Sequence, residues 1–117
     1  MITQPTVLYH YTCDHGYDQI SRSDWWLEAN PLAVFPLIWL TDLDQPDRDA
    51  LGLTSHILDC DRTEHRLTVQ NDGHVYHWTQ WCRLKAIPRH QRDAIELADG
   101  AQPMRWWVTP DPIRCGS

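Results

Sequence analysis

The stretch TVLYHYT, residues 6–12, is the part of this chain that most clearly predicts an element of the fold. It is rich in β-branched and aromatic residues, which is typical of a β-strand. Side chains on a strand alternate between its two faces, so Tyr9 and Tyr11 share one face. His10 and Thr12 share the other. We therefore expect a strand whose His10 face can form one wall of a cleft.

Similar patterns on either side predict the other elements. Apolar runs predict strands, and helical spacing followed by glycine predicts helices. Asp14 is the expected N-cap of the first helix. The expected elements are helices over residues 14–23, 47–51 and 88–98, an extended segment over 25–27, and strands over 37–41, 65–70 and 104–109.

Residues 71–73, Asn-Asp-Gly, carry a strong hairpin-turn signal. Residues 74–78 are therefore expected to pair with the strand over 65–70, although they could instead lead into a helix around Trp78 and Trp81. The order of elements predicts an α+β fold in a single domain spanning residues 1–117. We expect a mixed, mostly antiparallel sheet with two or three short helices.

Composition excludes several classes of protein. The net charge is −6 and Lys85 is the only lysine, so a nucleic-acid partner is not expected. The longest apolar run, residues 37–40, is too short to span a membrane. No export signal is visible, which predicts a cytoplasmic protein with reduced cysteines.

Seven tryptophans occur in 117 residues, four of them in the pairs Trp25-Trp26 and Trp106-Trp107. Neighbouring residues on a strand point to opposite faces, so each pair is expected to place one ring in the core. The second ring is covered by loops of the same domain, or by a ligand or partner. An exposed aromatic surface would suit a protein interface.

Ionisable side chains gather in residues 60–66, just before a predicted strand. Glu64 and Arg66 would share a face and could form a surface ion pair. Alternatively, Arg62 or Arg66 could anchor a phosphate or carboxylate through its guanidinium fork.

Metal binding is a weaker interpretation. His10, Cys13 and His15 supply donors within six residues. A structural zinc site usually shows two closely spaced ligand pairs, and these are missing here. The sequence therefore predicts no metal site.

The order of residues 8–12, a short helix containing Ile20, then Trp26-Leu27 and residues 37–41 resembles the opening of small ADP-ribosyltransferase-like proteins. The chain also looks like small bacterial and phage proteins for which we can name no function. The first resemblance implies an ADP-ribosyltransferase-like fold that binds NAD in a cleft next to the first strand. It further implies possible transfer of ADP-ribose to a macromolecular target.

The resemblance also implies roles for particular residues. His10 matches the family histidine that contacts the ribose of NAD, and the expected NAD-binding residues are His10, Tyr11, Thr12, Tyr17, Trp39, Thr41 and Arg62. Tyr76 is an alternative to Tyr17 for stacking on nicotinamide. The last predicted strand, residues 104–109, lacks the family's catalytic acid, so Glu64 is the candidate carboxylate. The alternative function is a non-catalytic phage or bacterial accessory protein that binds a partner protein through an aromatic surface.

Overall fold

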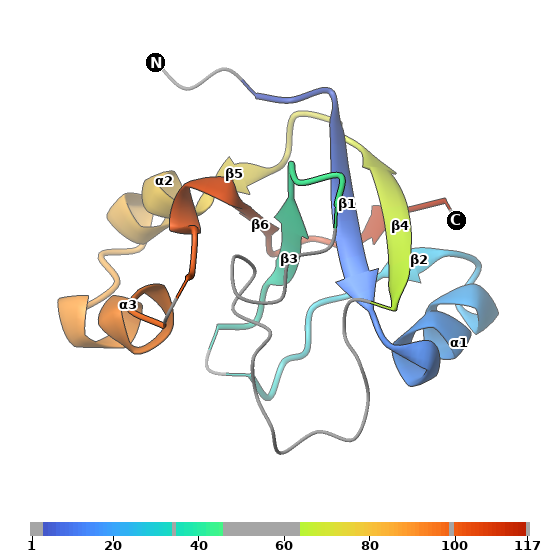
Figure 1. Ribbon diagram of the computed structural model, residues 1–117, viewed down its shortest axis with the longest axis horizontal. Helices are drawn as coiled ribbons and strands as arrows, with labels where there is room; N and C mark the ends of the chain where they lie inside the picture. Colours follow the sequence, from blue (N-terminus) through green and yellow to red (C-terminus); the bar gives the residue numbers. More distant parts are fainter. Residues whose placement is uncertain (1–3, 34, 46–63, 99, 117) are drawn as a thin grey trace.

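The computed structural model describes residues 4–33, 35–45, 64–98 and 100–116, and an antiparallel sheet forms its centre (Figure 1). Its elements are β1 (Val7–Thr12), α1 (Asp14–Arg22), β2 (Trp26–Leu27), β3 (Ile38–Thr41), β4 (His65–Gln70), β5 (Tyr76–His77), α2 (Trp78–Leu84), α3 (Arg89–Glu96), a 3-10 turn (Pro103–Arg105), β6 (Trp106–Thr109) and β7 (Ile113–Arg114).

The strand predicted from residues 6–12 lies inside the sheet, whose order is β4-β1-β3-β6-β5. β1 pairs with β4 from Val7 to Thr12 and with β3 at Tyr9. A second, two-stranded sheet joins β2 to β7. Thus β1, the strand that carries His10, has a partner on both sides.

The predicted α+β class is confirmed, and two expectations need correction. Every strand pair that the structure describes is antiparallel, so no mixed sheet forms among them. Cys13, not Asp14, is the N-cap of α1, and its side chain makes no capping hydrogen bond. The helix expected over residues 47–51 lies outside the described residues.

The prediction that residues 74–78 pair with the strand before the turn is wrong, although the turn at residues 71–73 forms. The side chain of Asn71 accepts a hydrogen bond from the Gly73 amide at 2.9 Å, and Gly73 has a positive φ of 88°. The chain then crosses the sheet, and β5 pairs with β6 at the opposite edge. One side of β4 is paired with β1, and its Thr68 forms a bridge to Gly116 on the chain's last described stretch.

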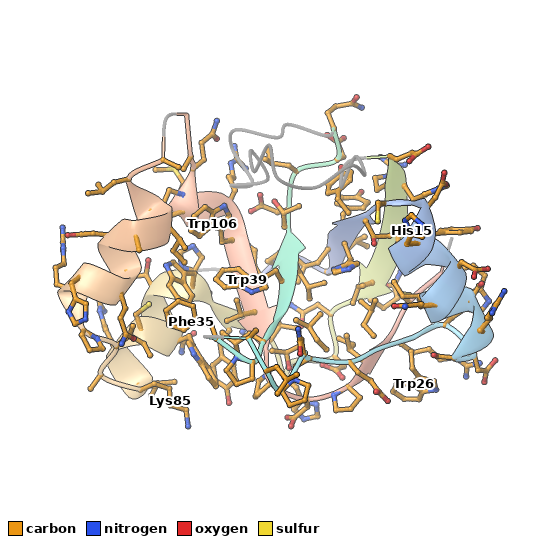
Figure 2. All side chains as sticks on the ribbon, turned by 90° about the horizontal axis from the view of Figure 1, so that it is seen from below. His15, Trp26, Phe35, Trp39, Lys85 and Trp106 are labelled. Carbon is orange, nitrogen blue, oxygen red and sulfur yellow. The ribbon has the colours of Figure 1, made fainter. Side chains whose placement is uncertain are left out.

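The two faces of the sheet have separate cores. Leu8 and Trp107 belong to the core on the face that α1 and the small sheet cover. Trp78 from α2 packs on the other face against Trp39 and Trp106, with ring centroids 4.9 and 6.4 Å away. Figure 2 shows Trp39 and Trp106 on the side of the molecule that carries the two C-terminal helices.

This arrangement corrects one expectation about the tryptophan pairs. Trp106 and Trp107 point to opposite faces, yet both are buried because each face is covered. In the other pair Trp25 is partly buried against Tyr17, whereas Trp26 is exposed. All seven tryptophans lie in the part of the chain that the structure describes, and Trp26 alone among them is exposed.

The helices are short, and none within the described ranges is long and apolar enough to cross a membrane. α2 begins directly after β5 because His77 caps it. Its Nδ1 accepts a hydrogen bond from the Thr79 amide at 3.2 Å, and its Nε2 donates to the Met104 carbonyl at 2.8 Å. The buried His77 ring therefore joins α2 to the turn before β6.

We expect His77→Ala to lower the free energy of unfolding by roughly 2–3 kcal/mol, because it removes a cap and leaves a carbonyl without its donor. Asparagine is a good N-cap, so His77→Asn should recover about 1 kcal/mol of this loss. Urea denaturation of the two variants checks the prediction. Equal stability of His77→Ala and the unaltered protein would contradict it.

Candidate functional site

A cavity of about 280 Å³ lies beside β1, on the face of the sheet that α1 covers. His10 and Thr12 of β1 form one wall, and Gln19 of α1 forms another. The segment after β2 adds Glu28 and Asn30. The cavity is therefore a hollow of mixed character, in which these five polar side chains face apolar residues such as Ile20, Leu27 and Ile38.

His10 is fixed in place by the neighbouring strand. Its Nδ1 lies 2.9 Å from the backbone carbonyl of Trp39. A carbonyl only accepts hydrogen bonds, so Nδ1 carries the proton and Nε2 is left with a lone pair. Among the described residues, no group pairs with Nε2. His10 thus offers an oriented hydrogen-bond acceptor at the cavity wall.

Burial lowers the pKa of His10 below its usual value of 6.5, and the hydrogen bond to Trp39 only partly opposes this shift. The neutral form of the ring therefore persists below the pH at which an exposed histidine is protonated. The unfolded chain takes up this proton at higher pH than the folded protein does. Acidification through that window consequently favours the unfolded state.

We expect the free energy of unfolding to fall as the pH drops from 7.5 towards 5, since the window begins at the ordinary pKa of about 6.5 and extends below it. His10→Asn should have a shallower slope because it cannot bind the proton. Thermal or urea unfolding at several pH values, with the exposed His90→Asn as control, measures the difference. Identical slopes for His10→Asn and the unaltered protein would show that His10 is not the group responsible.

The close approach of α1 to β1 depends on a glycine. A Cβ placed on Gly16 would collide with the hydroxyl group of Thr12. Both residues line the cavity. The absence of a side chain at position 16 therefore lets the first turn of α1 lie against the end of β1.

The structure brings His10 and Thr12 together at the cavity, as strand alternation predicts, but places other predicted residues elsewhere. Trp39 borders the cavity, yet its ring packs on the opposite face of the sheet against Trp78 and Trp106, and its backbone carbonyl holds His10. Tyr11 lies on the opposite face of the sheet, and its hydroxyl donates to the Leu43 carbonyl at 2.9 Å. Burial raises the pKa of Tyr11. Thr41 is buried and accepts a hydrogen bond from the Leu43 amide at 3.1 Å. Tyr11 alternates with His10 along β1, and Thr41 pairs with Tyr9 across the sheet, so both side chains point away from the His10 face.

Two further predicted residues lie beyond the end of β1. Tyr17 stacks on His65, with ring centroids 4.3 Å apart and an angle of 22° between the planes. Glu64 is exposed and lies with Asp14 and His65, and neither Tyr17 nor Glu64 lines the cavity. Tyr76, the alternative to Tyr17, packs against Trp81. Arg62 lies outside the described residues.

Sequence reasoning missed Gln19, Glu28 and Asn30 as cavity residues. A signal existed for Gln19, because Gly16, Gln19 and Ile20 have the i, i+3, i+4 spacing of one helix face. Glu28 and Asn30 belong to a connecting segment whose path depends on the pairing of β2 with β7. No local pattern marks that pairing.

Comparison of the chain with protein-family models, with curated proteins and with solved structures gave no match.

Proposed function

We propose that the cavity beside β1 binds the nicotinamide-ribose half of NAD, as expected of an ADP-ribosyltransferase-like protein. The observation that carries the proposal is that His10 lines the cavity with its ring fixed by the bond from Nδ1 to Trp39, while no described residue pairs with its Nε2. This acceptor suits a ribose hydroxyl or a carboxamide N–H. Gln19 and Asn30 add amide groups that both donate and accept.

The size of the cavity limits the part of NAD that enters it. A volume of about 280 Å³ lies near the lower end of the range for ligand pockets, which is about 300–1,000 Å³. One ring and its ribose suit this volume, whereas the adenosine half would extend towards solvent. NAD would accordingly bind bent, with its reactive bond near His10.

Transfer of ADP-ribose would additionally need a carboxylate to stabilise the positive charge that develops on the ribose. Glu64 is the candidate from the sequence, and Glu28 is the acid at the cavity wall. Comparing Glu64→Gln with Glu28→Gln for release of nicotinamide distinguishes the two. The proposal assigns catalysis to Glu64 only when Glu64→Gln abolishes release.

Binding is tested by adding NAD and following the melting temperature. At a concentration a hundredfold above its dissociation constant, a ligand stabilises the folded state by about 2.7 kcal/mol. For a chain of this length we expect a rise in the melting temperature on the order of 10 °C. No rise at millimolar NAD would exclude the proposed function.

The alternative function, binding of a partner through an aromatic surface, has less support. Six of the seven tryptophans are buried or partly buried, and the exposed Trp26 is 41% accessible. The other large exposed apolar side chains are Leu32, Leu84, Leu97 and Met104. Among the large exposed apolar side chains of the described residues, Trp26 is therefore the only aromatic one.

A further inference from the structure

Three metal-binding side chains from distant parts of the chain meet where β1 and β4 reach the start of α1. Asp14 is the first residue of α1, Glu64 immediately precedes β4, and His65 begins that strand. One ligand atom from each residue lies within 4.8 Å of the other two. We call these residues the Asp14–Glu64–His65 cluster. None of the three lines the His10 cavity.

The imidazole of this cluster is held on two sides. Tyr17 stacks on the His65 ring from α1, with a centroid distance of 4.3 Å. The Nε2 atom of His65 lies 2.5 Å from Oδ1 of Asp14. The side chains of His65 and Asp14 remain 29% and 71% exposed, so an ion in solution can reach them.

His65 is the basic side chain that pairs with Asp14, and no arginine or lysine of the described residues adds to it. Asp14 and Glu64 place two carboxylates together. The sequence allows Arg66 either an ion pair with Glu64 or a role as an anchor for a phosphate or carboxylate. Its guanidinium instead donates to the Asp44 carbonyl and lies over the Tyr9 ring, 5.0 Å from the ring centre. Two neighbouring carboxylates repel each other unless a cation or proton lies between them.

We propose that the Asp14–Glu64–His65 cluster binds a divalent transition-metal ion of the Zn²⁺ class. Zn²⁺ binds both imidazole nitrogen and carboxylate oxygen, and three protein ligands leave a fourth position open for water. Ligand atoms about 2.1 Å from one ion are roughly 3–3.5 Å apart. The atoms of the cluster lie within 4.8 Å of one another, with Nε2 of His65 and Oδ1 of Asp14 at 2.5 Å, so binding requires rotation of these side chains to that spacing. Imidazole disfavours Mg²⁺ and Ca²⁺, which prefer oxygen ligands.

Titration of the chelator-treated protein with ZnCl₂ by calorimetry tests this site, together with NMR of the histidine ring nitrogens. We expect one Zn²⁺ ion to bind, to shift the His65 signals, and to bind at least tenfold more weakly to Asp14→Asn and His65→Gln. Loss of a hydrogen-bond partner behind a metal ligand already lowers metal affinity by about 10–100-fold, so loss of a ligand itself should cost at least tenfold. Asp14 is largely exposed, so Asp14→Asn should fold even where His65→Gln does not.

The exposed pair Asp72 and His74 supplies a matched control, because its carboxylate and imidazole lie 3.4 Å apart and no third ligand among the described residues joins them. His74→Gln should bind Zn²⁺ like the unaltered protein. The proposal is overturned by the absence of Zn²⁺ binding, by equal affinity in Asp14→Asn and the unaltered protein, or by equally tight binding of Mg²⁺. The NAD titration at the His10 cavity succeeds or fails independently of these results.

Discussion

Trp78→Ala should lower the free energy of unfolding by about 3–5 kcal/mol, the largest stability effect we expect from a single substitution. The Trp78 side chain is fully buried and fills the space between the sheet and α2. Its ring lies 5.3 Å from that of Phe35 and 4.9 Å from that of Trp39. Alanine would leave a cavity lined by these rings, and a domain of this size has only about 5–15 kcal/mol of stability.

Two further variants make this prediction specific. The indole Nε1–H of Trp78 is buried, and no described residue accepts a hydrogen bond from it. Trp78→Phe removes that donor and keeps most of the packing, so it should cost clearly less than Trp78→Ala. Trp26→Ala, at an exposed position, should cost under about 1 kcal/mol. Urea denaturation measures all three, and similar losses for Trp26→Ala and Trp78→Ala would contradict the described core.

His10→Asn should weaken NAD binding roughly 10- to 100-fold under the proposed function. Asparagine can still donate to the Trp39 carbonyl, but its shorter side chain no longer places an acceptor where Nε2 lies. A ligand donor left unpaired in a buried site costs about 1–3 kcal/mol, and each 1.4 kcal/mol is tenfold in affinity. Fluorescence titration of the tryptophans measures the dissociation constants.

His90→Asn is the control for this second prediction. It makes the same change at an exposed position on α3, away from the cavity lining. Its affinity for NAD should match that of the unaltered protein. Equal losses in both variants would point to a general effect on the fold, and no loss in His10→Asn would remove His10 from the binding site.

Much of the fold follows from local patterns in the sequence. β1 and β4 were predictable because alternation and β-branched residues mark strands that contact a core on one face. Residues 71–73 form the turn that their sequence predicts, but β5, the strand after the turn, pairs with β6 and not with β4. That choice is tertiary, because β1 already occupies one side of β4 and β6 offers its free edge to β5. Local turn chemistry contains no information on such competition.

The candidate site was predictable to a smaller extent. Alternation along β1 correctly assigned His10 and Thr12 to one face, and this face is the cavity wall. The same rule separates Tyr11 from them, although the family resemblance grouped all three. Glu28 reaches the cavity through the pairing of β2 with β7, which joins segments more than 80 residues apart and has no sequence signature. Glu64 and Asp14 meet through the β1–β4 register.

The most direct test of the proposed function is NMR of the histidine ring nitrogens during titration with NAD. A ligand donor bound to His10 must shift the Nε2 signal of that ring. We predict a saturable shift at His10, with His90 unchanged and the shift absent from His10→Asn. A titration that leaves the His10 signals unchanged, or that moves only histidines outside the cavity, would contradict NAD binding beside β1.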